Sequence, residues 1–217
     1  MLKIEHTEVY GWEPAIRGMR NPMNSWEKSD SEWEFVEDPS IINPNDEVKF
    51  VLGPNDRELM MRLANGGPVH AKYRRMIIVY ADITAPLYWW KEFDTYKVGT
   101  VSNSCSTMHK IHSKEFSRED FSCDRLTPEA LDTLDALIDF LEGERKKFVD
   151  TKDVAHWHNM IQILPSSYNQ KRTVSLGYEV LANIYESRKN HKLQEWHVLC
   201  DWIRSLPNSQ LITQDIP

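Results

Sequence analysis

Residues 85–110, APLYWWKEFDTYKVGTVSNSCSTMHK, join an aromatic run to a polar run. The aromatic residues at 87–90 lead into charged residues at 91–94, which predicts a helix over 87–97. The residues at 100–107 carry small hydroxyl and amide side chains and almost no apolar anchor, which predicts a polar loop. Residue type alone leaves two interpretations open: a solvated turn after a helix, or a loop that lines a polar ligand site.

The composition is that of a globular protein. Its 217 residues are 41% hydrophobic and 27% charged, which predicts a single domain over 1–217. The formal net charge of −7 argues against a general nucleic-acid-binding protein and leaves room for a local basic site for one phosphate. The eight tryptophans and eight tyrosines suit either a hydrophobic core or a site for a planar ligand.

The cysteine pattern and the hydropathy of the sequence indicate in which cellular compartment the protein is expected. Cys105, Cys123 and Cys200 are odd in number and widely spaced, which argues against a disulfide scaffold and for a reducing environment. The first residues lack a signal-peptide profile, and no apolar run approaches the roughly 18 residues of a membrane span. We therefore expect a cytoplasmic protein without a membrane segment.

Periodicity and turn residues predict an α+β fold with a mixed sheet, several packed helices and more helix than strand. Region 21–45 contains Pro22, Pro39 and Pro44, and we expect a long irregular excursion fastened by Trp26 and Trp33. The helix over 87–97 should open at 82–86, with its cap at Thr84 or its start near Pro86. The expected strands cover 3–10, 48–52, 73–80 and 172–176, and the other expected helices cover 12–19, 56–65, 127–141, 154–164, 178–190 and 193–206.

Histidine and cysteine positions do not predict a metal centre or a nucleophile. His156 and His158 lie on a predicted helix, where residues two apart point in different directions, so the pair suits a metal poorly. His109 and His112 could share a helix face but have no third ligand at suitable spacing. Cys105 in the polar run could be a nucleophile, but no histidine lies at a recognisable spacing and an ordinary cysteine is favoured.

Basic residues near the last helices suggest anion binding. Lys171 and Arg172 enter a predicted strand, and Arg188 and Lys189 close a predicted helix. Cations at a helix C-terminus are stabilised by the helix dipole, so a purely structural role is one interpretation. A guanidinium beside a polar loop would also suit a phosphate or a pyrimidine edge.

The order of these elements resembles the flavin-dependent thymidylate synthases. In that family a glycine turn is followed by a strand, an Ala-Pro helix start and an Arg-His-Arg signature, and later by a Leu-Pro, a strand and a helix ending in Leu-Arg. The likeness covers most of 56–196 as a succession of elements and is weak as a string of identities. The matching positions are Asn65-Gly66-Gly67, the strand 77–80, Ala85-Pro86, Leu164-Pro165, the strand 172–176, the helix ending at Arg188, and Gln194-Glu195.

The resemblance also assigns site residues. The Arg-His-Arg signature falls on Thr95-Tyr96-Lys97, where only Lys97 keeps a positive charge, and the Asn-x-Arg triplet falls on Gly177-Tyr178-Glu179. The family's Asn-Glu pair begins at Ser102 or, with a one-residue shift, at Asn103, and its loop serine falls on Cys105 or Ser106. The implied cofactor-binding residues are Tyr96, Lys97, Asn103 and Asn183, and the implied substrate-binding residues are Glu92, Cys105, Ser106 and Arg188, with Arg188 also the catalytic anion-binding residue.

In that family reduced FAD passes a hydride on during methylation of dUMP, with methylenetetrahydrofolate as carbon donor. The protein positions its ligands, supplies no covalent nucleophile and forms sites between subunits of a homotetramer. The resemblance therefore implies a divergent methyltransferase-like enzyme that binds FAD, a pyrimidine deoxynucleotide such as dUMP, or both, with folate as a further partner. Because the Arg-His-Arg signature is replaced, two alternatives stay open: a cofactor-free homologue that binds nucleotide or protein, and an unrelated α+β domain.

Overall fold

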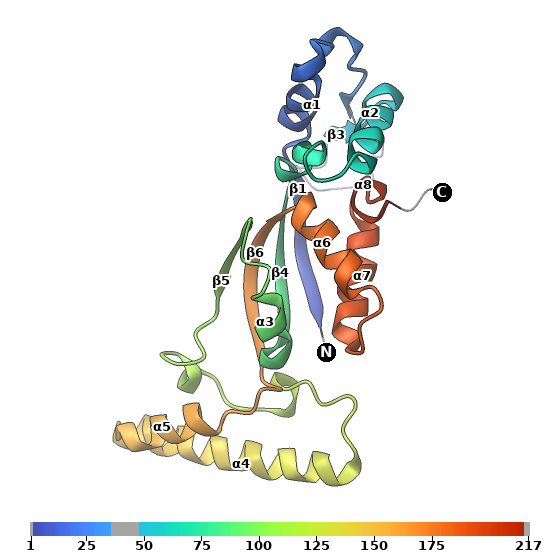
Figure 1. Ribbon diagram of the computed structural model, residues 1–217. Coiled ribbons are helices and arrows are strands. Elements are labelled where there is room, and N and C mark those ends of the chain that lie inside the picture. The colour runs from blue at the N-terminus through green and yellow to red at the C-terminus, as the bar shows by residue number, and fades with distance from the viewer. Residues whose placement is uncertain (1, 36–47, 215–217) are drawn as a thin grey trace. The chain divides into compact units, whose positions relative to one another are not determined.

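The computed structural model describes residues 2–35 and 48–214 (Figure 1). The chain divides into two compact units: unit 1 consists of Met1–Thr7, Ala81–Lys97 and Val101–Val174, and unit 2 of Glu8–Tyr80, Val98–Thr100 and Ser175–Pro217. Helices and strands both contribute, so the expected α+β class is confirmed. The single domain over 1–217 stays a prediction.

Four strands form one sheet, and each strand has residues in both units. The order across the sheet is β1 (Lys3–Tyr10), β4 (Ile78–Pro86), β6 (Asn169–Gly177) and β5 (Thr100–Ser104).

Strand β4 extends further than the sequence predicts. We expected a strand ending at Tyr80 and a helix opening at 82–86, but β4 runs to Pro86 and α3 (Leu87–Phe93) begins at the next residue. The reason is an alternation of buried and more exposed residues that continues to the end of the strand, because side chains of a strand point to opposite faces in turn. The buried members are Val79, Ala81, Ile83 and Ala85, each at most 1% exposed.

The predicted polar loop over 100–107 is wrong in its first half, which is strand β5. This strand lies at the end of the sheet order, and its residues 101–104 are exposed. A solvated edge strand needs no apolar side chains, so its composition is that of a loop. The preceding helix also ends early, at Phe93, where the Thr95 hydroxyl donates to the Glu92 carbonyl at 2.7 Å.

In unit 1, helices α4 (Pro128–Thr151) and α5 (Val154–Ile163) pack against each other (Figure 1). Helix α4 begins as predicted: the Thr127 hydroxyl accepts from the Ala130 amide, and Pro128 takes the first position. Two short 3-10 helices, Ile111–Ser113 and Arg118–Asp120, precede this pair. The core that these elements share contains Ile111, Phe116, Phe121, Leu134, Ile138, Leu141 and Met160.

In unit 2 the core forms around large aromatic residues. Trp12 packs edge-on against Tyr178 with ring centroids 5.5 Å apart, and Trp196 is fully buried. The helices of this unit are α1 (Trp12–Arg20), α2 (Pro54–Asn65), α6 (Tyr178–Arg188), α7 (Gln194–Ser205) and α8 (Gln210–Thr213), with 3-10 helices at Asn21–Met23, Trp26–Lys28 and Ala71–Arg75.

The predicted irregular excursion over 21–45 contains regular elements within its described residues, 21–35. Strand β2 (Glu32–Phe35) pairs antiparallel with β3 (Val48–Val51), while 36–45, with Pro39 and Pro44, lie outside the described residues. The tryptophans are not its main fastening, because Trp26 and Trp33 are each 51% exposed. A buried ion pair holds the segment instead.

That pair joins Arg20 to Asp56, with Nε to Oδ1 at 2.7 Å. The second carboxylate oxygen of Asp56 accepts from the hydroxyls of Ser29 and Ser31 at 2.8 and 2.6 Å. Burial opposes ionisation of Asp56, but the hydrogen bonds from Ser31, Ser29 and Arg20 outweigh it and lower its pKa.

Within residues 2–35 and 48–214, every helix is too short or too polar to span a lipid bilayer.

Candidate functional site

The predicted site residues of unit 1 flank α3 and β5. Glu92 lies on α3 and is partly buried, and Tyr96 follows the helix with its amide bonded to the Phe93 carbonyl. Lys97 and Asn103 are exposed, and neither side chain forms an ion pair or hydrogen bond with another residue in the described part of the chain. Both are therefore available to a ligand.

The other two predicted residues of this group, Cys105 and Ser106, form hydrogen bonds with neighbouring residues. The Cys105 amide donates to the Lys171 carbonyl at 2.9 Å, and its carbonyl accepts from the Gln170 amide at 2.8 Å, while the residue remains exposed. The Ser106 hydroxyl accepts from the His109 amide at 2.9 Å and closes a local turn. These contacts shape the segment after β5 without engaging the Cys105 thiol.

Arg172, which the sequence offers as an anion ligand, is engaged within unit 1. Its guanidinium lies over the Trp90 ring at 4.1 Å and donates to Asp94 at 2.7 Å. A cation that stacks on an indole and pairs with a carboxylate is held in one orientation. Its charge is largely balanced by Asp94, so the structure favours a positioning role between α3 and β6.

In unit 2, helix α6 carries the two remaining predicted residues. The Arg188 guanidinium lies over the Trp196 ring at 4.5 Å, which orients the charge at the C-terminal end of the helix. Asn183 is exposed and lines a pocket of about 300 Å³ beside α6. The pocket volume is at the lower end of the range typical for small-molecule sites.

The same pocket contains Arg74, which sequence analysis missed. Arg74 is only 6% exposed, and its Nε and Nη2 atoms are buried without a hydrogen-bond partner among the described residues. Buried guanidinium donors are nearly always satisfied in proteins, so two orphaned nitrogens mark a place where a partner is expected. The only sequence signal is the basic run at 72–75, which is ordinarily a solvated surface.

Two carboxylates line this pocket, and both have cationic partners. Glu179 accepts from the Nε and Nη2 atoms of Arg75 at 2.5 and 2.9 Å, and Glu186 accepts from Lys189 at 2.8 Å. These pairs offset the negative charge of the lining, so the positive charge of Arg74 is not cancelled within it.

The positions of the family's Asn-x-Arg triplet have structural roles here. A Cβ on Gly177 would lie 3.3 Å from the Arg74 carbonyl oxygen, so only a small residue fits well. The buried Tyr178 hydroxyl donates to the Pro207 carbonyl at 2.5 Å, and burial raises its pKa well above the ordinary value. Together with Glu179, which also lines the pocket, these residues anchor the start of α6.

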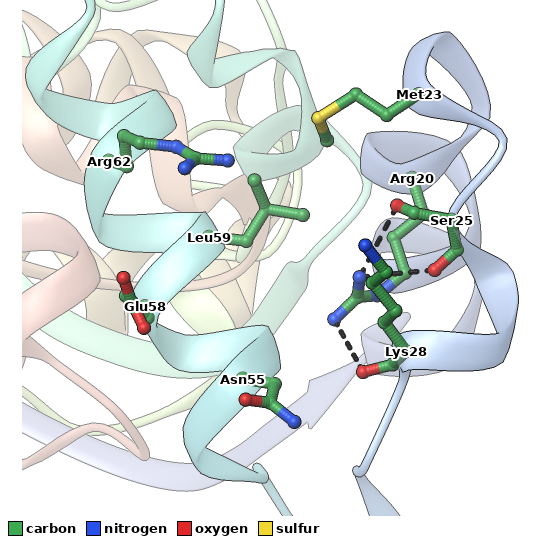
Figure 2. A pocket seen from close by; sticks show the side chains of 8 residues that line it. All are labelled: Arg20, Met23, Ser25, Lys28, Asn55, Glu58, Leu59 and Arg62. Carbon is green, nitrogen blue, oxygen red and sulfur yellow. Dashed lines mark hydrogen bonds between the residues drawn. The ribbon is translucent and has the colours of Figure 1, made fainter.

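Two further pockets lie in unit 2. One of about 400 Å³ opens between α2 and the segment that follows α1, and its lining includes Arg20, Lys28 and Arg62 (Figure 2). The other, of about 500 Å³, is mostly apolar, with Met19, Leu63 and Tyr73 in its lining.

The histidines do not gather into a metal centre in the described part of the chain, where no group of three potential His, Cys, Asp or Glu ligands occurs. The His156 Nδ1 atom lies 2.7 Å from the Glu144 carboxylate, on the pair of helices α4 and α5. Hydrogen bonds from Lys147, Asn159 and His156 lower the pKa of Glu144 to about 2 against the opposing effect of burial. This cluster ties α5 to α4.

Comparison with known proteins identifies the fold. No family model and no curated protein matches the chain. Two solved structures of thymidylate synthase X from Helicobacter pylori with FAD and dUMP align with TM-scores of 0.68 and 0.66, at 16% and 17% identity. The first alignment covers 99% of this chain and 98% of that chain, and the second covers 100% and 99%.

A third structure, the UMP/dUMP methylase PolB from Streptomyces cacaoi bound with 5-Br UMP, aligns with a TM-score of 0.61 at 10% identity. This alignment covers 99% of this chain and 94% of that one. The chain therefore has the fold of the flavin-dependent thymidylate synthases, and the fold predicted from the order of its elements is confirmed.

Proposed function

We propose that this protein binds FAD, a pyrimidine nucleotide such as dUMP, or both, and that the pocket beside α6 holds a ring of that ligand. One observation carries the proposal: Arg74, whose guanidinium has two buried nitrogens without a hydrogen-bond partner among the described residues, lines the same pocket as Asn183. Proteins of this fold solved with FAD, dUMP and 5-Br UMP make these ligand classes the first to consider.

The donor set suits a ring that carries carbonyl groups. A guanidinium offers only donors, and a side-chain amide offers both donors and an acceptor. The pyrimidine of dUMP and the isoalloxazine of FAD both present carbonyl oxygens and ring nitrogens along one edge. A ligand oxygen on Arg74 would relieve a burial cost of about 1–3 kcal/mol, which supports binding there.

The volume of the pocket limits which part of the ligand it can hold. A space of about 300 Å³ suits a pyrimidine or one end of a flavin, and a whole dinucleotide would extend beyond it.

The residues present thus fit a flavin ring, and FAD when bound would supply hydride transfer. Arg74 and Asn183 would hold the ring edge, and the orientation of Arg188 on Trp196 suits it to a ligand phosphate. The other assignments are Tyr96, Lys97 and Asn103 toward the cofactor, and Glu92, Cys105 and Ser106 toward the substrate. A methyltransferase reaction with folate, a homotetrameric assembly and a cytoplasmic location complete the proposal.

The first test is the visible absorbance spectrum of the purified protein, followed by equilibrium dialysis against FAD and thermal unfolding with dUMP and UMP. We expect either a flavin spectrum or a nucleotide-dependent rise in Tm, since a ligand that binds the folded state stabilises it. A colourless protein that takes up no FAD and gives no shift with either nucleotide would overturn the proposal and favour the cofactor-free alternative.

Arg188 provides a residue-level test of the same proposal. We expect Arg188→Ala to remove the nucleotide-induced Tm shift and leave the fold intact, because a charge-assisted hydrogen bond to phosphate is worth about 1.5–3 kcal/mol. Lys97→Ala is the parallel variant in unit 1. An unchanged nucleotide shift in both variants would show that the assignment of these residues is wrong.

A further inference from the structure

The pocket between α2 and the segment after α1 has the construction of an anion site. Helix α2 presents Asn55, Glu58, Leu59 and Arg62 to it, a spacing of three, four and seven residues that places them on one helix face. The opposite wall is formed by Arg20, Met23, Ser25 and Lys28. Figure 2 shows the side chains of Arg62 and Lys28 extending toward the space between these walls.

The three cations of this pocket have different roles. Arg20 is 3% exposed and fully committed: it donates to Asp56 at 2.7 Å, to the Ser25 carbonyl at 3.1 Å and to the Lys28 carbonyl at 3.0 Å. These bonds fix the backbone of the Lys28 wall while leaving the Lys28 side chain exposed. Because Asp56 balances the charge of Arg20, that pair adds little net charge to the pocket.

Lys28 and Arg62 make no ion pair or side-chain hydrogen bond with any residue in 2–35 or 48–214. Among the described residues of the lining Glu58 is the one acidic residue, so with the two uncommitted cations these residues carry a net positive charge. This local excess stands out in a chain whose formal net charge is −7. The amides of Asn55 and Asp56 at the start of α2 are already bonded to the Asp30 carboxylate, so the helix N-terminus is not the attracting element.

We propose that this pocket is a binding site for a phosphoryl group, held between the Lys28 ammonium and the Arg62 guanidinium. Arginine matches the geometry of phosphate oxygens, and lysine adds a mobile point charge. The volume of about 400 Å³ admits a phosphate or diphosphate with part of an organic group attached. The site is separate from the residues assigned above to ring binding, and the inference does not depend on that assignment.

The test is isothermal titration of the full chain with inorganic pyrophosphate, dUMP and FAD at low salt. We expect the wild-type chain to bind pyrophosphate, and the double variant Lys28→Met, Arg62→Met to bind it at least tenfold more weakly. Both positions are exposed, so neither substitution should disturb folding. Arg57→Met, an exposed arginine of the same helix outside the pocket, is the matched control and should bind like the wild type.

The titrations with dUMP and FAD identify the source of the phosphoryl group. A parallel loss of nucleotide affinity in the double variant would assign the pocket to the phosphate of a nucleotide, and an unchanged affinity would assign it to a small phosphorylated compound. Equal pyrophosphate affinity in wild type and double variant, or no pyrophosphate binding by the wild type, would overturn the inference. Since an Arg74 variant would leave pyrophosphate binding intact, failure here is distinguishable from failure of the proposed function.

Discussion

At the scale of single residues, Arg74 has an unfavourable effect on stability and a proposed role in ligand binding. A charged group that is only 6% exposed, with two nitrogens that lack a partner among the described residues, destabilises the folded chain, because its lost hydrogen bonds to water are not replaced by them. Binding sites commonly hold such groups, since their satisfaction by a ligand contributes to affinity. Both effects, the loss of folding stability and the gain in ligand affinity, can be measured.

We predict that Arg74→Met will leave the unliganded protein as stable as the wild type, or more stable by about 1 kcal/mol, while weakening ligand binding about tenfold or more. Methionine fills similar space without buried donors. Denaturant unfolding gives the first quantity, and titration with dUMP and FAD gives the second. Arg17→Met, at an exposed arginine of α1, is the control. A variant that is much less stable but binds normally would show that Arg74 is purely structural.

Asp56 presents the opposite case, a buried charge whose hydrogen bonds are satisfied. Asp56→Asn would leave the buried Arg20 guanidinium without its counter-ion, a change that typically costs about 3–5 kcal/mol. We therefore predict a large fall in the free energy of unfolding, measured by denaturant titration. Asp135→Asn removes an exposed partner of Arg118 and should change stability little. Similar losses in both variants would contradict the assignment of Asp56 as the main fastening of the segment after α1.

At the scale of elements, amphipathic helices with capping residues were predictable and the edge strand was not. Helix α4 begins at the Thr127-Pro128 signal and α1, α2, α6 and α7 lie close to their expected positions, because helix periodicity and caps are local properties. Strand β5 escaped prediction because its partner β6 lies far away in sequence, and its exposed side chains carry no alternation. Arg74 escaped for a similar reason, since its burial depends on packing that no local pattern records.

The junction of α4 and α5 should depend on pH through Glu144. Its pKa is lowered to about 2 by hydrogen bonds from Lys147, Asn159 and His156, from an ordinary value of 4.5. A lowered pKa means that the contribution of Glu144 to stability is fully present above pH 4.5 and is lost as the pH falls from 4.5 toward 2.

We predict that Glu144→Gln will be less stable than the wild type above this window and that the difference will shrink as the pH falls through it. Denaturant midpoints measured on both sides of the window test the prediction. Glu115→Gln, whose side chain is 80% exposed, should show no comparable change. A stability difference that is constant across the window would contradict the role given to ionised Glu144.

At the scale of the whole molecule, the proposed homotetramer connects the predicted site residues with assembly. Lys97 and Asn103 belong to unit 1, and Asn183 and Arg188 belong to unit 2. In the proposed tetramer each site lies between copies of the chain, so ligand binding depends on assembly. Several large apolar side chains are exposed, among them Val98 at 92% and Phe35 at 79%, and their burial would favour association. The net charge of −7 on each chain opposes it, most strongly at low salt.

If ligand binding needs the assembly, the two equilibria must be linked, and the linkage is reciprocal. We predict that dUMP or FAD will shift dissociation of the tetramer to lower protein concentration, and that dilution into the dissociated range will reduce ligand affinity. Light scattering across a dilution series, with and without ligand, measures the first effect, and titration at two protein concentrations measures the second. Arg188→Ala should still assemble but lose the ligand-dependent shift. A monomer that binds dUMP with concentration-independent affinity would contradict the tetrameric site, and would place the whole binding surface within one copy of the chain.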